Sequence, residues 1–124
     1  MTTPLEVKKV LTLSIYGRSE VREFTDETAH LVLREAVGGH LEHIHLPTLG
    51  VDMWVNEEGK LKHLPPNQFA TYLWIDSYGT RANGYVDVIA GNAAFTKGTD
   101  DEGNTTGLSE DDIVIIKKMI ERVL

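Results

Sequence analysis

Apolar residues recur along this chain with two different periods, and this change of period most constrains its fold. Over residues 7–16 and 51–56, apolar and polar residues alternate, which is the pattern of strands with one buried face. Over residues 25–37 and 109–123, apolar residues recur every three or four positions, which places them on one side of a helix. Two strands, a helix, several strands and a last helix follow one another. This order predicts an α+β domain with a mainly antiparallel sheet and two helices.

The ends of the two expected helices carry the residue types that cap helices. Thr25 or Asp26 is expected to cap the first helix, because a short polar side chain can accept a hydrogen bond from the first turn. Gly38 and Gly39 should end this helix, since glycine tolerates the left-handed conformation of a C-terminal cap. Ser109 is expected to cap the last helix, and three acidic residues follow it.

Shorter segments fill the chain between the helices. Further strands are expected over 20–24, 40–46 and 85–95. A turn over 56–60, with its glycine late, predicts a hairpin whose return strand covers 60–64. The segment 67–76 suits a short helix, but its β-branched and aromatic residues also suit a strand. The sequence leaves both interpretations of this segment open.

The length of the chain sets the number of domains. With 124 residues it can bury one hydrophobic core, so we expect a single domain over 1–124. Hydrophobic residues make up 41% and charged residues 25%, which argues against global disorder. Residues 96–107 are polar and rich in Gly, Asp and Thr, which predicts a flexible acidic loop.

Composition narrows the classes of function. The chain has no cysteine, which excludes disulfides, thiolate nucleophiles and thiolate metal ligands. Its net charge of -7 makes it a poor general binder of nucleic acid, whose phosphates attract basic surfaces. The sequence has neither the layout of a signal peptide nor an apolar run that could span a bilayer. We therefore expect a cytoplasmic protein that binds neither nucleic acid nor membrane.

Four segments of the sequence, in this order, resemble those of one known family. They are EAVGGHLEHI at 35–44, NEEGKL at 56–61, LPPN at 64–67 and DVIAGN at 87–92. On these segments the chain resembles domain-of-unknown-function family 3846. The resemblance implies a small phage-type protein in the cytoplasm of a bacterial host, and it implies no activity. Within the segments we expect structural roles for Gly38, Gly39, Asn56, Gly59, Pro65 and Asn67.

His43 and His45 are candidates for metal ligands. They lie two residues apart, so on a strand they share one face, and Asp52 on a neighbouring strand could add an oxygen ligand. A metal site normally needs three or four ligands, and the alternative is a pair of histidines on a solvated strand face. We favour the solvated pair and expect no metal and no cofactor.

Other candidates for chemistry have simpler structural explanations. Glu42, Glu57 and Glu58 could supply an acid/base pair, but adjacent residues of an extended chain point opposite ways. The glycine pair at 38–39 follows a helix C-terminus, whereas phosphate is held by the amide groups of a helix N-terminus. The loop 99–104 lacks the glycine spacing of a calcium loop. We therefore predict no catalytic residues.

Trp54, Tyr72, Trp74 and Tyr78 are candidates for a contact surface. Aromatic residues anchor many protein interfaces, but they also fill cores. Trp54 alternates with apolar neighbours, so it should face away from the side of the sheet that they occupy. Whether a helix covers that second side is not determined by the sequence, and both interpretations stay open.

Three classes of function follow from these observations. The first is a phage-type accessory protein without enzymatic activity, which binds a host protein and modulates the host or counters its defence. The second is a protein that sequesters a small molecule or nucleotide signal, and its candidate lining residues are Asn56, Lys60, Asn67 and Arg81. A metal-dependent enzyme is the least favoured class. A homodimer is a further expectation, because a small domain often closes an uncovered sheet edge with a symmetric partner.

Overall fold

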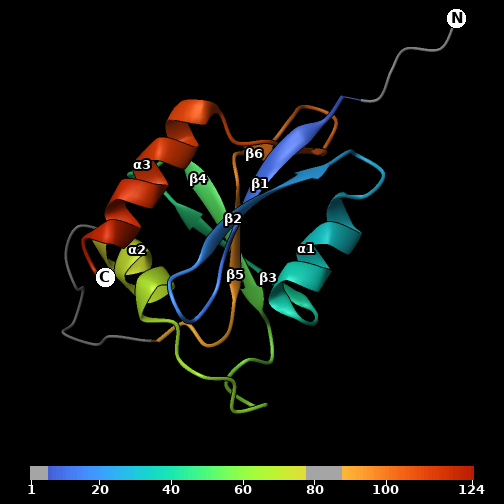
Figure 1. Cartoon of the computed structure of the whole chain (residues 1–124). Coiled ribbons are helices and arrows are strands. Elements are labelled where there is room, and N and C mark those ends of the chain that lie inside the picture. Colours follow the sequence, from blue (N-terminus) through green and yellow to red (C-terminus); the bar gives the residue numbers. More distant parts are fainter. Residues whose placement is uncertain (1–5, 78–87) are drawn as a thin grey trace, which may run out of the picture.

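The computed structural model describes residues 6–77 and 88–124, and it shows one antiparallel sheet between helices on both faces (Figure 1). The strands of the sheet are β1 (Lys8–Leu13), β2 (Ser19–Phe24), β3 (Leu41–Leu46), β4 (Val51–Asn56) and β5 (Ala93–Thr96). They are arranged in the order β2-β1-β5-β4-β3, and all four pairings are antiparallel. The helices are α1 (Ala29–Val37), α2 (Gln68–Ser77) and α3 (Glu110–Glu121). A small hairpin of β6 (Gly98–Thr99) and β7 (Thr105–Thr106) precedes α3.

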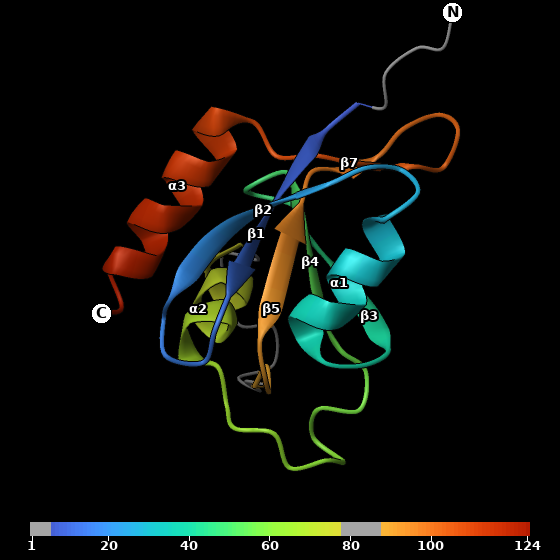
Figure 2. The ribbon, with the colours of Figure 1, turned by 45° about the vertical axis from the view of Figure 1, so that its right-hand side comes forward.

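The strand alternation divides the core into two layers. α1 covers one face of the sheet, and α2 and α3 cover the other (Figure 2). Leu11 and Phe95 belong to the layer under α2 and α3, whereas Val10 and Ala94 belong to the layer under α1. Every residue of β5 is buried, because this strand lies in the centre of the sheet with helices on both sides. The α+β class and the antiparallel sheet are therefore confirmed.

The prediction of two helices is wrong, because the segment left open at 67–76 forms α2. Asn67 begins this helix by accepting a hydrogen bond from the Ala70 amide on its side-chain oxygen, at 3.0 Å. Phe69 and Leu73 lie one turn apart and both are buried against the sheet. Tertiary packing, and not the residue types of the segment, decides between helix and strand here.

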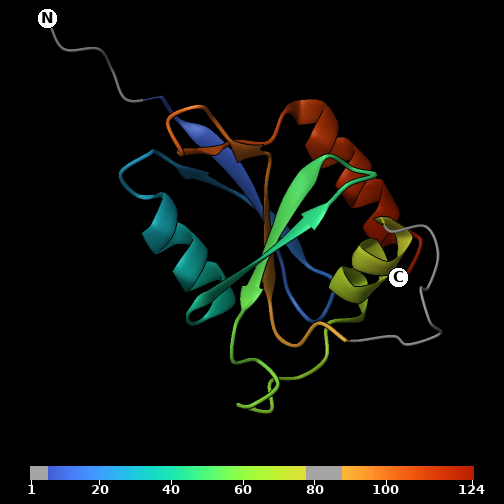
Figure 3. The ribbon, with the colours of Figure 1, turned by 180° about the vertical axis from the view of Figure 1, so that it is seen from behind.

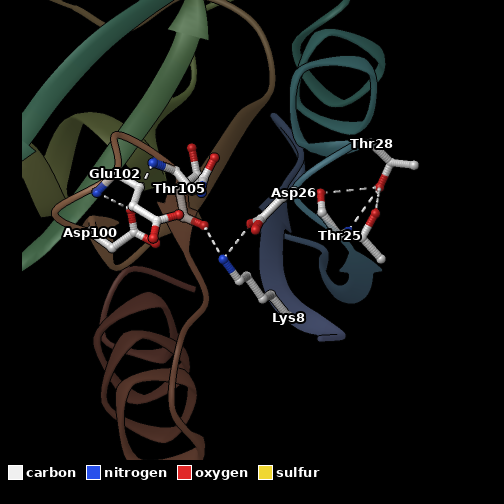
Figure 4. A network of polar contacts seen from close by, with 8 residues as sticks. Lys8, Thr25, Asp26, Thr28, Asp100, Glu102 and Thr105 are labelled. Carbon is white, nitrogen blue, oxygen red and sulfur yellow. Dashed lines mark hydrogen bonds and ion pairs between the residues drawn. The ribbon is translucent and has the colours of Figure 1, made fainter. Parts of the chain in front are cut away.

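The first helix starts later than the sequence indicates. Its N-terminal cap is Thr28, without a side-chain capping bond, so the expected cap at Thr25 or Asp26 is wrong. Asp26 instead accepts a hydrogen bond from the Lys8 ammonium group at 2.5 Å, and the Thr105 carbonyl accepts another at 2.9 Å (Figure 4). The hydrogen bond to Asp26 raises the pKa of Lys8. Lys8 thereby connects β1 to the segment before α1 and to the β6–β7 hairpin.

The expected hairpin after β4 is also wrong. Residues 57–63 form consecutive turns, with no return strand over 60–64. The physical reason is that β4 already has a partner on each side, β3 and β5, so its edges have no place for a further strand. The turns fold over the end of the sheet instead, and the Leu64 amide donates to the Gly59 carbonyl at 2.9 Å.

The last predicted strand is shorter than the 85–95 range. Among the described residues it covers Ala93–Thr96, and positions 85–87 lie outside them. Gly91 interrupts the strand with a left-handed backbone, φ 86°, and the preceding Ala90 forms an isolated bridge with Pro66. The acidic loop at 96–107 contains the β6–β7 hairpin, whose turn is held by Asp100 (Figure 4).

The last helix begins as its sequence predicts. The Ser109 hydroxyl accepts from the Asp112 amide at 3.1 Å, and the Asp112 carboxylate accepts from the Ser109 amide at 3.0 Å. Lys97 also donates to this carboxylate, at 3.0 Å. Burial raises the pKa of Asp112, but the hydrogen bonds from Ser109 and Lys97 outweigh it and hold the pKa below its ordinary value of 3.8. The reciprocal pair is a capping box.

Asp112→Asn is expected to destabilise the protein at neutral pH and to make its stability less sensitive to acid. A depressed native pKa means that the charged carboxylate stabilises the fold above the unfolded value, and that this stability is lost as pH falls through the native value. The difference in urea-unfolding midpoint between wild type and variant should therefore begin to shrink at about pH 4 and be smallest below the native pKa of Asp112. Asp111→Asn, an exposed substitution in the same turn, is the control. A difference from wild type that stays constant with pH would contradict the linkage.

Candidate functional site

The edge strand β3 carries most of the residues that the sequence singles out, and alternation sorts them onto two faces. Glu42 and Ile44 lie on the face that α2 and α3 cover. His43 and His45 lie on the face of α1, opposite Trp54 and Asp52 of β4. Figure 3 shows β3 and β4 from the side on which this edge is nearest the viewer.

The α2 side of β3 borders a hollow with a volume of about 280 Å³, which we call the β3–α2 hollow. It is lined by Glu42, Ile44, Val55, Asn56, Glu57, Gly59, Lys60, Leu61, Trp74, Val88, Ile89 and Ala90. Two more open hollows, of about 370 and 610 Å³, share Val88 with it and continue it toward Pro66 and Tyr72. The three together make a broken groove along one side of the domain.

The four sequence segments that carry the family resemblance meet at this groove. The first contributes Glu42 and Ile44, the second contributes the turns at 56–61, and the fourth contributes residues 89–90. The third borders the adjoining hollow through residues 64 and 66. The sequence did not indicate that they meet, because the segments are far apart along the chain and only the folded sheet brings them together.

Several residues of these segments have structural roles and are not available for contacts of their own. The buried Asn56 amide donates to the Val37 carbonyl at 3.3 Å, and its oxygen accepts from the Glu58 amide at 2.8 Å. Gly39 packs so closely on Asn56 that a Cβ atom there would lie 2.8 Å from its amide nitrogen. Gly38 has a left-handed backbone, φ 78°, as the cap of α1. The Pro65 carbonyl accepts from the Gly91 amide at 2.7 Å.

Other residues of the hollow present apolar surface to solvent. Leu61 is 82% exposed and Val88 is 42% exposed. Ile44 and Trp74 are half-buried and pack against the main core at the base of the same hollow. An exposed leucine beside a partly covered tryptophan is an apolar surface of the kind that contacts a partner.

The predicted aromatic surface is split between the two faces of the sheet. Trp54 packs against the core layer under α1, and its indole nitrogen donates to the Thr96 hydroxyl at 2.9 Å. Trp74 lines the β3–α2 hollow, and Tyr72 lines the adjoining one. Tyr78 lies outside the described residues. The aromatics therefore form no common patch across the described part of the chain.

The histidines and Asp52 lie together, but they bond one another. His43 Nε2 is 3.0 Å from Asp52 Oδ2, and His45 Nδ1 is 2.8 Å from Asp52 Oδ1. The Asp52 side chain is only 8% exposed, and the His43 ring lies 4.9 Å from that of Trp54. Within residues 6–77 and 88–124, no group of three or more His, Cys, Asp or Glu side chains could hold a metal ion. The carboxylate thus lies between the two rings, with a hydrogen bond to His45 and with His43 at ion-pair distance.

The glutamates take separate positions. Glu42 and Glu57 line the β3–α2 hollow, whereas Glu58 forms an ion pair with Lys62 at 3.6 Å. Of the proposed pocket residues, Lys60 and Asn56 line the hollow, Asn67 is fully buried elsewhere, and Arg81 lies outside the described residues.

The helices that the structure describes are too short and too polar to span a bilayer.

Fold and site together define an α+β protein with a single antiparallel sheet covered on both faces, and with a lined groove at one edge. Comparison with family models then identifies it: the chain belongs to the family described as Domain of unknown function (DUF3846), which matches residues 8–122. This match confirms the family resemblance of the four segments. Neither a curated protein nor a solved structure matches the chain.

Proposed function

We propose that this protein is a non-enzymatic binding protein that docks on a partner protein through the β3–α2 hollow. The observation that carries the proposal is the exposed Leu61 on the same hollow as Trp74, at the place where the family-like segments meet. In the phage setting that the resemblance implies, the partner is a host protein whose activity or defence role is altered. The exclusion of a nucleic-acid partner rests on the net charge of -7.

Burial of apolar surface supplies free energy for docking. Full burial of a leucine side chain is worth about 1.5–3 kcal/mol, and Leu61 gains almost none of this in the isolated chain because it is 82% exposed. Hot spots of interfaces are enriched in tryptophan, which Trp74 supplies in this hollow. A partner that covers Leu61 and the accessible part of Trp74 would recover this free energy.

Leu61→Ser is expected to weaken binding of the partner about tenfold, and to change the free energy of unfolding by less than about 0.5 kcal/mol. Leu31→Ser is the matched control, because Leu31 is also exposed, at 59%, but lies on α1 on the other face of the sheet. A photo-crosslinking residue at position 61 should give a discrete protein adduct in the bacterial host, and one at position 31 should not. Equal adducts at both positions, or none at position 61, would contradict the proposal.

A small-molecule sequestering protein is the second candidate, and the tryptophan that lines the hollow supports it. About 280 Å³ is close to the lower limit of ligand pockets, and Trp74 offers an aromatic surface for stacking. Native mass spectrometry of the protein from its host distinguishes the two functions. Extra mass of a small molecule on each protomer would support sequestration, whereas the bare chain together with the adduct at position 61 would support docking.

A further inference from the structure

We infer that the partner segment that enters the β3–α2 hollow carries a lysine or arginine next to an apolar side chain. This inference rests on the proposed docking function and adds the chemistry of the partner. Two observations support it. Carboxylates line the hollow, and other acidic side chains close to it have partners within the chain.

Glu42 and Glu57 place two exposed carboxylates on the same hollow as Leu61 and Trp74. In the described ranges, neither carboxylate has a hydrogen bond or an ion pair with another side chain. Glu57 uses its backbone amide to bind the His40 carbonyl, which fixes the start of the turns but leaves its side chain uninvolved. Among the described residues, two carboxylates without a side-chain partner thus border the same hollow as Ile44 and Trp74.

The neighbouring acidic groups differ in this respect. Glu58 pairs with Lys62, and Asp52 is bonded by His43 and His45 on the other face of β3. Each of these two carboxylates therefore has a side-chain partner within the chain. Glu42 and Glu57 have none among the described residues, so they are the carboxylates of this region that a partner can bind.

Charge complementarity selects the class of occupant. Among the described residues the hollow is lined by Lys60 and by two glutamates, and the chain as a whole carries -7. A phosphate-bearing or acidic segment would meet repulsion from both carboxylates, whereas a basic side chain would be attracted over a distance of about 10 Å. Ile44 and Trp74 also give the hollow apolar surface. The partner segment should therefore carry an apolar side chain next to its basic one.

The probe for this inference is a short synthetic peptide with one leucine flanked by lysines, and its counterpart with glutamates in place of the lysines. Binding is measured by titration of isotope-labelled protein with each peptide, followed by amide chemical shifts. We expect the lysine peptide to shift the amide signals of residues 42, 57 and 61 and the indole signal of Trp74. The glutamate peptide should leave them in place.

Glu42→Gln combined with Glu57→Gln should weaken binding of the lysine peptide about tenfold. The control pair Asp101→Asn and Glu102→Gln removes the same charge from the exposed tip of the β6–β7 hairpin, and it should weaken binding less than about threefold. Equal weakening by both pairs would show general attraction to an acidic protein and overturn the inference. Binding of the glutamate peptide, or no binding of either, would overturn it as well. If the protein adduct at position 61 still forms in that case, only the charge inference fails and the docking function stands. If this adduct does not form either, both the inference and the docking function fail.

Discussion

Asn67→Ala is expected to lower the free energy of unfolding by about 3–4 kcal/mol. The Asn67 side chain is fully buried and donates to the carbonyls of Leu13 at 3.3 Å and Gly91 at 3.0 Å, while its oxygen caps α2. Alanine would remove the cap and leave two buried carbonyl groups without these donors. Such a loss is a large share of the stability of about 5–15 kcal/mol that is typical of a domain. Urea unfolding followed by circular dichroism measures it.

Two further variants separate the mechanism from a general effect of asparagine. Asn67→Asp keeps the acceptor for α2 but places carboxylate oxygen against the two carbonyls, so it should be at least as harmful as alanine. Asn92→Ala is the exposed control, because the Asn92 oxygen accepts only the Ile15 amide at 3.2 Å among the described contacts, and it should cost less than about 1 kcal/mol. Similar costs for Asn67→Ala and Asn92→Ala would contradict the role of the buried amide.

Gly59→Ala is expected to cost about 1–3 kcal/mol and to disturb the β3–α2 hollow. A Cβ atom at Gly59 would lie 2.9 Å from the Ala90 carbonyl oxygen, which is backbone and cannot turn aside. The turns at 57–63 would have to move away from Ala90, in the irregular segment before β5, and both border the hollow. Urea unfolding measures the cost, and the crosslinking yield at position 61 measures the change in the hollow.

Gly103→Ala separates this steric effect from backbone strain. Gly103 has a left-handed backbone, φ 84°, but nothing lies within 4 Å of its added Cβ atom. Its substitution should therefore cost about 1 kcal/mol and leave the crosslink at position 61 unchanged. If Gly59→Ala proves as stable as wild type, the close approach to Ala90 does not hold the turns in place.

The candidate site could be predicted only in parts. The residue types at His43, His45 and Asp52 indicated a common face of adjacent strands, and the structure places them together, with both histidines in contact with the Asp52 carboxylate. Trp74 was a candidate from its residue type alone. Leu61 was missed, because a leucine near a turn carries no local signal of exposure. Its significance comes from the missing return strand, since the turns that replace the strand leave Leu61 in solvent.

The sequence by itself determined the elements whose signals are local. β4 has the bounds that alternation predicts and α3 starts at its predicted cap, because alternation and caps depend only on neighbours within a few residues, although α3 ends earlier than predicted and β4 is buried on both faces. The tertiary structure decided the rest. The insertion of β5 between β1 and β4 joins residues distant in the chain, and it excludes a return strand beside β4. Burial against the sheet makes 68–77 a helix, and the meeting of β3, the turns at 57–63 and α2 creates the hollow, because pairing and packing depend on contacts that no local pattern encodes.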